Sequence, residues 1–357
     1  MTAKHQHIAN HEITASQDLP YSSLVTDSVV RNRDGTYVCT WRIDGIPFET
    51  TDAVDLSIKK EALNQLIRGL GEVALWSHRI RRQYQDQFQQ PYPEAFSDSL
   101  AKRYYASFDG YNMMQNETYL TLCYRPYGRV KSGLFGRVIS LTEKSERALK
   151  DAENHALRKM AELIAQIQVS LKAYAIERLS TYQENNIQYS QQLSFYGYLL
   201  NGVWEKVPVT HHCIREILQT SRLFFVGEKL EIRAPNQKRF AALLDLKDYP
   251  ENTDSGCLNG LLYTPYEYIE TQSFSILDKP TAKDKLERQR NQLITTEDAG
   301  VSQINALNVA LDQLTNGDFV YGEYHYTLAV LGSSLDETSR NMAHARSVLS
   351  DEGYQTA

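Results

Sequence analysis

One apolar stripe constrains the fold of this chain more than any other feature. Between Leu149 and Tyr174, apolar residues recur every three or four positions, which is the spacing of one face of an α-helix. They are Leu149, Ala152, Ala156, Met160, Leu163, Ile167, Leu171 and Tyr174. With capping chemistry at Thr142 and Glu146, the stripe predicts a long amphipathic helix over 142–178, roughly 50 Å in length. It suits a helix inside a domain core or an intermolecular coiled coil, and we favour the core.

The segments around this helix alternate between strand and helix patterns. Strands are predicted at 27–32, 37–43, 73–80, 117–124, 223–226, 229–233, 240–246, 268–277 and 319–330. Helices are predicted at 56–70, 97–108, 190–200, 280–314 (with a break at Gly300) and 334–349. Turn residues at 34–35 and 227–228 separate two pairs of strands and predict hairpins. The order predicts an α+β fold of mostly antiparallel sheets covered by helices.

Turn signals and composition divide the chain into three parts. Residues 1–19 contain no apolar run long enough for a signal peptide, so they predict a flexible tail. Residues 20–205 are expected to form an N-terminal α+β domain that includes the long helix, and 206–357 a second α+β block. Because another strand is expected after Gly353, this second block is predicted to be truncated before the rest of the protein.

Charge and cysteine content limit the partners and the compartment. The 38 basic and 44 acidic residues give a net charge of −6, so any contact with nucleic acid or a membrane must be local. Four cysteines without CxxC spacing predict unpaired thiols in a reducing compartment, by default the cytoplasm. The uncharged stretch 185–204 is too rich in Gln, Asn and Ser to span a bilayer.

The segment 125–137, RPYGRVKSGLFGR, is locally basic and contains no acidic residue. Lys131 and Ser132 resemble the end of a P-loop, but Val130 occupies the position where that motif requires glycine. The segment therefore predicts either a solvated loop or a contact with anionic lipid headgroups or an acidic partner. The candidate contact residues are Arg125, Arg129, Lys131 and Arg137.

Residues for catalysis or metal binding are scattered. His5, His7 and His11 lie in the predicted tail, and the run 211–213 combines two histidines with a cysteine at a predicted helix start. HExxH and GxSxG are both absent. We therefore predict no catalytic, cofactor-binding or metal-binding residue, and the rival is a small-molecule site assembled from distant residues.

The segment 319–330, FVYGEYHYTLAV, raises the possibility of a stacking platform for bases. Strand alternation places Tyr324 and Tyr326 on a mostly apolar face, expected to lie under helices. The other face carries Glu323 among its rings, and a carboxylate repels phosphate. We therefore favour a core strand, and keep a nucleic-acid-binding module as the alternative.

That alternative would use the tyrosine strand together with three arginines that follow one another closely in the sequence. They are Arg79, Arg81 and Arg82.

Two stretches of the chain resemble a known family. They are QINALNVALDQLTNGDFVYGEYHYTLAVLGSSLDETSRNMAHARSVLSDEGY at 303–354 and PYSSLVTDSVVRNRDGTYVCTWRIDGIPFET at 20–50. Their order of helix, G-x-Y-H strand and helix is similar to the N-terminal region of the large ATPase of type IV secretion and conjugation machines, the CagE/TrbE/VirB class. The resemblance extends over most of the chain.

This resemblance implies a parent ATPase that energises pilus assembly and DNA or protein transfer at the cytoplasmic face of the bacterial inner membrane. ATP and Mg²⁺ would be held by a C-terminal RecA-like motor that this sequence lacks, so the segment itself is predicted to be a catalytically silent docking module. The implied partners are inner-membrane subunits of the secretion system, further copies in a dimer or hexamer, and the membrane surface. No direct contact with nucleic acid is implied.

Overall fold

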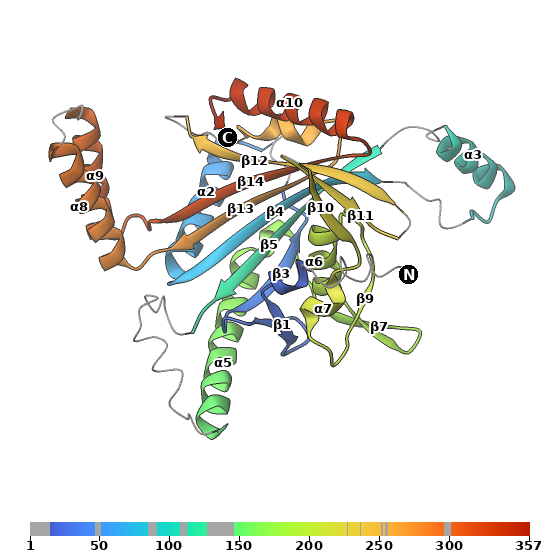
Figure 1. The fold of residues 1–357 in the computed structure, drawn as a ribbon, viewed down its shortest axis with the longest axis horizontal. Coiled ribbons are helices and arrows are strands. Elements are labelled where there is room, and N and C mark those ends of the chain that lie inside the picture. Colours follow the sequence, from blue (N-terminus) through green and yellow to red (C-terminus); the bar gives the residue numbers. More distant parts are fainter. Residues whose placement is uncertain are drawn as a thin grey trace, which may run out of the picture. The chain divides into compact units, whose positions relative to one another are not determined.

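The computed structural model describes residues 15–46, 51–84, 91–107, 113–126, 146–226, 228–235, 237–250, 253, 256–295 and 301–357. Within these ranges the predicted α+β class is confirmed, since helices pack on a sheet of 12 strands and a second sheet has three. Strands and helices are mixed along the whole chain (Figure 1). The strand pairs with a defined register are antiparallel, as predicted.

The main sheet has ten strands in one hydrogen-bonded order, with two further strands attached to it. The order is β1 (Tyr21–Leu24), β2 (Val30–Asn32), β3 (Tyr37–Ile43), β5 (Met113–Tyr124), β4 (Val73–Tyr84), β13 (Tyr268–Ile276), β14 (Gly322–Gly332), β12 (Lys238–Asp248), β11 (Lys229–Arg233) and β10 (Arg222–Val226). The attached strands are β6 (Ile176–Arg178) on β3 and β15 (Gln355–Thr356) on β12. The small sheet contains β7 (Thr181–Glu184), β8 (Ile187–Ser190) and β9 (Val207–Pro208).

The α-helices are α2 (Ala53–Gly69), α3 (Ala95–Ala106), α5 (Glu146–Ser170), α6 (Gln191–Asn201), α7 (Ile214–Leu218), α8 (Lys279–Thr295), α9 (Val301–Asn316) and α10 (Leu335–Asp351). Short 3-10 turns lie at Ala15–Gln17, Lys172–Tyr174 and Asn259–Tyr263. No helix among the described residues combines the length and the apolar character that crossing a bilayer requires.

The chain forms two compact units, and each is assembled from three separate stretches. The first unit consists of Met1–Ser77, Tyr119–Thr220 and Gln272–His325, and the second of His78–Thr118, Ser221–Thr271 and Tyr326–Ala357. Residue 205, where the sequence analysis places a domain boundary, lies inside the first unit. The two units are therefore interleaved along the sequence.

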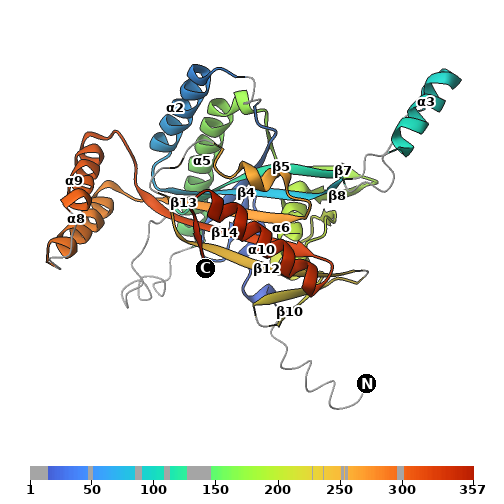
Figure 2. The same ribbon diagram turned by 90° about the horizontal axis from the view of Figure 1, so that it is seen from above.

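The core of the first unit forms where α5 and α2 pack over β3 and β5. Trp41 from β3 and Met160 and Ile167 from α5 are each 0% exposed and belong to one apolar cluster. Figure 2 shows α2 and α5 side by side, and Leu66 and Leu70 at the end of α2 join the same cluster. The stripe from Ala156 onward is thus buried within the chain, which confirms the core interpretation for this part of the helix.

The long helix is shorter than predicted at its C-terminal end. α5 ends at Ser170, whereas the predicted helix continues to 178. A 3-10 turn follows, and Ala175 then adopts a left-handed conformation with φ 49°. Ile176–Arg178 form β6, which pairs with β3. The apolar spacing that includes Tyr174 therefore predicted too long a helix. The residues that follow Tyr174 form a strand because they pair with β3.

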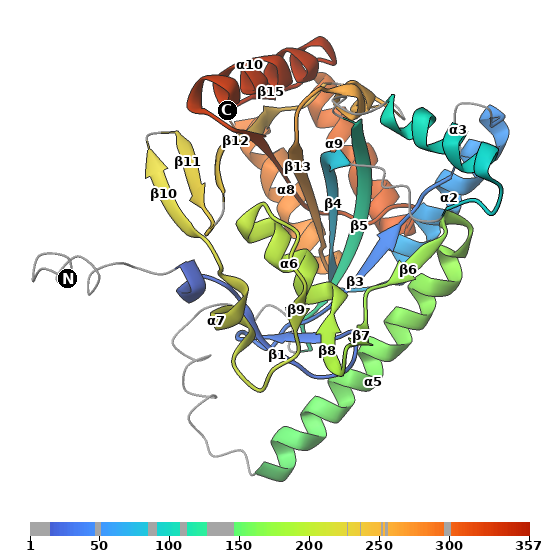
Figure 3. The ribbon, with the colours of Figure 1, turned by 90° about the vertical axis from the view of Figure 1, so that its right-hand side faces the viewer.

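The predicted helix at 190–200 is confirmed as α6, and its ends follow local rules. Ser190 caps it by accepting a hydrogen bond from the backbone N–H of Leu193 at 3.3 Å. Gly202 ends it with φ 67°, a conformation that glycine adopts readily. Figure 3 shows the small sheet of β7, β8 and β9 beside α6.

The helical stretch predicted at 280–314 is interrupted, since α8 and α9 are separate helices packed side by side (Figure 1). The predicted position of the break, Gly300, lies outside the described residues. Lys279 at the start of α8 donates to the carbonyl oxygen of Thr315 near the end of α9, at 2.7 Å. This contact holds the base of the helical pair.

In the second unit, α10 covers β12 and β14 (Figure 2). Leu328 and Val330 from β14 pack with Ala345 and Leu349 from α10, and all four are 0% exposed. Ser334 caps α10 by accepting from the backbone N–H of Glu337 at 3.2 Å. A strand of two residues, β15, follows Gly353 within the chain, whereas the predicted truncation rests on this strand being missing.

We expect Met160→Ala to lower the free energy of unfolding by about 3 kcal/mol, because it removes a fully buried side chain and leaves a cavity. Val169 is a control on the same helix and is 77% exposed, so Val169→Ala should change stability by less than about 0.5 kcal/mol. Urea unfolding followed by circular dichroism measures both. Equal effects of the two substitutions would contradict the proposed core.

Candidate functional site

The predicted basic contact segment is described only at its first two residues, Arg125 and Pro126. Arg125 follows β5, forms an ion pair with Asp34 and donates from Nε to the Thr36 hydroxyl at 3.2 Å. Arg129, Lys131 and Arg137 lie outside the described residues. The charge of Arg125 thus already has a carboxylate partner at the turn between β2 and β3, and its role as a partner contact stays a prediction.

The three arginines of the nucleic-acid alternative lie on β4 in the second unit and have partners there. Arg82 donates to both oxygens of Glu117, at 2.9 and 3.1 Å. Arg81 is buried and donates from Nε to the carbonyl oxygen of Thr264 at 2.6 Å.

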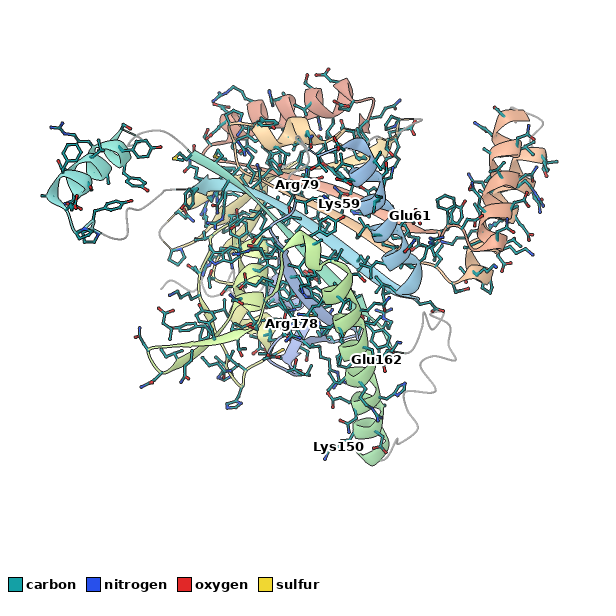
Figure 4. All side chains as sticks on the ribbon, turned by 180° about the vertical axis from the view of Figure 1, so that it is seen from behind. Lys59, Glu61, Arg79, Lys150, Glu162 and Arg178 are labelled. Atoms are coloured by element: carbon teal, nitrogen blue, oxygen red, sulfur yellow. The ribbon has the colours of Figure 1, made fainter. Side chains whose placement is uncertain are left out.

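Arg79 is the third of these arginines, and it pairs with Glu270 on β13 at 3.3 Å. The Glu270 side chain is 1% exposed (Figure 4 labels Arg79). Together these contacts join β4 to its neighbouring strands. The three cations therefore act in strand cohesion, which weakens the case for phosphate binding.

A third contact of the same kind joins Arg239 on β12 to Glu267. Glu267 also accepts from the backbone N–H of Gln83 at 2.8 Å. Nearby, burial raises the pKa of the Tyr268 phenol well above its usual range, so this hydroxyl remains protonated. The cluster is a structural network of paired charges, and not a set of groups prepared for proton transfer.

The tyrosine strand does not present its rings on one face. Tyr326 is fully buried, as predicted, whereas Tyr324 is 44% exposed and its hydroxyl donates to Gln272 at 3.2 Å. The expectation that Tyr324 lies under a helix is therefore wrong. β12 pairs with β14 only from Thr327 onward. At the start of β14, the alternation of side chains between the two faces of the strand therefore does not separate buried from exposed residues. Tyr321 instead points to α9, where it donates to the carbonyl oxygen of Ala310 at 3.3 Å.

The exposed side of α5 remains a candidate surface for a protein partner. Lys150 and Glu162 lie on this helix (Figure 4), and Lys159 forms an ion pair with Glu162 at 3.1 Å. A surface hollow follows the helix and is lined by Asp151, Asn154, Leu157, Arg158 and Ala161. Protein interfaces combine an apolar centre with a polar rim, so side chains of both kinds can take part in one.

Among the described residues, no group of three His, Cys, Asp or Glu side chains is arranged to hold a metal ion. Burial raises the pKa of the Cys39 and Cys123 thiols to about 12, which keeps both thiols protonated and unreactive near neutral pH. The sulfur of Cys257 lies 3.2 Å from the Tyr354 hydroxyl, inside the core of the second unit.

We expect Glu270→Gln to lower the free energy of unfolding by roughly 3 kcal/mol, because it leaves the mostly buried Arg79 without its carboxylate. The double substitution Arg79→Met with Glu270→Leu should recover most of this loss. As a control, Glu287→Gln breaks the exposed pair with Lys283 and should cost less than about 0.5 kcal/mol. A double variant no more stable than Glu270→Gln in urea unfolding would refute the pairing.

His78 predicts a pH dependence of stability. Burial lowers the pKa of its imidazole to about 4, and its Nδ1 lies 3.0 Å from the Thr271 hydroxyl. Because the unfolded chain binds this proton with a pKa of about 6.5, stability should fall as pH decreases from 6.5 to about 4. We expect a loss of roughly 2 kcal/mol between pH 7 and pH 5 from this residue.

Urea unfolding of His78→Gln across the same pH range should show a shallower dependence. His155→Gln, the same substitution at an exposed position of α5, is measured beside it as the matched control. An identical slope in His78→Gln and in the unaltered chain would contradict the assignment.

Comparison with known proteins identifies type IV secretion system proteins that match nearly the whole chain. The chain is 42% identical to the type IV secretion system protein virB4 of Brucella suis, covering 99% of this chain and 43% of that protein. It is 35% identical to the type IV secretion system protein PtlC of Bordetella pertussis, covering 97% of this chain and 42% of that protein. The virB4 protein of Bartonella quintana is 30% identical, with 97% and 44% covered. The chain thus spans less than half the length of these relatives.

Two family models match two separate parts of the chain. One, described as type IV secretion system ATPase VirB4/TrbE, N-terminal domain, matches residues 28–131. The other, described as CagE, TrbE, VirB family, component of type IV transporter system, matches residues 177–357, which is just over half of the chain. The resemblance noted in the sequence is confirmed, and the chain belongs to the CagE, TrbE, VirB family of type IV transporter components.

Proposed function

We propose that this chain is the docking and assembly part of a type IV secretion ATPase that energises pilus assembly and substrate transfer. The observation that carries the proposal is the similarity to virB4 proteins over 99% of the chain. The described residues contribute paired charges and buried thiols instead of a reactive constellation, which suits a binding role.

In this proposal ATP and Mg²⁺ are bound elsewhere in the longer protein, by a RecA-like motor. The 357 residues contain no GxxxxGK[ST] sequence, so the backbone cradle that such a loop gives to phosphates is not encoded here. The partners are inner-membrane subunits of the secretion system and further copies of the ATPase. The setting is the cytoplasmic face of the inner membrane.

The outer side of α5 is the surface we assign to a secretion-system partner. Its hollow combines the carboxylate of Asp151 and the guanidinium of Arg158 with the apolar Leu157, so it can accept both charged and apolar contacts. The segment 125–137 is the second proposed contact.

The tagged chain, produced in cells that carry its secretion system, should cross-link to secretion-system subunits. Reversing two charges on α5, with Lys150→Glu and Arg158→Glu, should reduce this cross-linking at least five-fold. The control is Arg340→Glu with Arg346→Glu, which makes the same charge change on exposed positions of α10. Undiminished cross-linking in the α5 variant would remove this helix from the proposal.

Purified chain should hydrolyse no ATP above background, and turnover that follows the protein through purification would refute the prediction that this segment is catalytically silent. Fluorescence anisotropy with a single-stranded oligonucleotide tests the nucleic-acid alternative. Salt-dependent binding that is lost in Tyr321→Ala would favour that alternative.

A further inference from the structure

Helix α3 exposes a stripe of apolar side chains, and its polar Lys102 and Arg103 are exposed as well. Phe96, Leu100 and Tyr104 recur every four residues on one side of the helix, and they are 78%, 59% and 60% exposed. Ser97, Asp98, Ala101 and Tyr105, which project toward the other sides, are half-buried. A helix of a globular protein ordinarily has the opposite orientation, with the apolar stripe turned inward.

Packing within the described chain does little to stabilise this helix. α3 has 12 residues, and none of them is buried. Isolated helices of this length are marginal in water, because few hydrogen bonds compensate for the entropy of nucleation. A surface that covers the apolar stripe would therefore stabilise the helix as well as bind it.

The charges of α3 indicate what kind of surface this is. Asp98 lies on the opposite side from the stripe and is paired with Lys102 at 2.7 Å. Arg103 lies on nearly the same side of the helix as Phe96, about two turns further along, since it follows Phe96 by seven residues. The apolar side of the helix thus carries a cation and no carboxylate.

We propose that α3 lies in the interface of a membrane with anionic lipids, with the stripe of Phe96, Leu100 and Tyr104 inserted among the headgroups. A phenylalanine and a leucine supply apolar area, and the tyrosine supplies a ring with a polar tip suited to the interface. Arg103 can keep its guanidinium at the phosphates while its methylene groups follow the apolar surface. This inference rests on the proposed membrane setting and gives it a defined surface.

The test is flotation of the 357-residue chain with vesicles of phosphatidylethanolamine and phosphatidylglycerol, compared with vesicles of phosphatidylcholine. The unaltered chain should float with the anionic vesicles. Phe96→Gln with Leu100→Gln should weaken partition at least ten-fold, because about 1.4 kcal/mol per lost apolar contact corresponds to a factor of ten. Arg103→Gln should weaken it about five-fold on anionic vesicles at low salt and leave phosphatidylcholine binding unchanged.

Phe225→Gln is the matched control, because Phe225 is 76% exposed and lies on β10 instead of α3. It should alter partition less than two-fold, and thermal unfolding should show that all variants remain folded. No flotation of the unaltered chain, or equal flotation of the Phe96→Gln, Leu100→Gln variant, overturns the proposal.

Sedimentation without vesicles separates a protein partner from a lipid partner. A chain that self-associates through α3, and becomes monomeric in the Phe96→Gln, Leu100→Gln variant, would assign the stripe to a second copy and overturn the lipid assignment. Absence of vesicle binding with intact cross-linking to secretion subunits would reject this inference alone. Absence of the cross-linking would instead count against the docking function proposed for α5.

Discussion

Burial of one side of α5 is the interaction on which the first unit depends. Met160, Ile167 and Leu171 pack against residues from β3, β5 and the end of α2, so a single helix gathers segments that lie far apart in the sequence. Because the hydrophobic effect scales with apolar area removed from water, this cluster supplies the common reason for those segments to fold together. The helix is thus used as an internal support, and its opposite side is left for other contacts.

The elements that sequence reasoning located correctly are those governed by local chemistry. The serine and glycine around α6, the turn before β3 and the break between α8 and α9 can each be read from a few neighbouring residues. Pairing partners were harder to predict. Tyr324 is exposed because β12 pairs with only part of β14, and α5 stops early because β6 joins β3. Both outcomes depend on strands remote in sequence, which periodicity does not describe.

The same distinction applies to the charged residues. The sequence shows three arginines close together on one predicted strand but gives no indication of their partners. In the fold, Glu117 and Glu270 reach Arg82 and Arg79 from neighbouring strands, so a motif that suggested phosphate binding contributes to sheet cohesion. The exposure of the apolar stripe of α3 could be foreseen no better, since a stripe at helical spacing predicts amphipathicity without saying which side faces the solvent.

The interleaving of the two units has a consequence for how the protein is made. The first unit needs residues up to His325, while stretches of the second have already been synthesised by residue 118. Neither unit can be completed before its last stretch has been synthesised, so early strands wait for partners that emerge much later. A protease cut near residue 205 would likewise release two fragments that are each incomplete. The N-terminal and C-terminal halves of the chain therefore depend on each other to fold, because neither contains a complete unit.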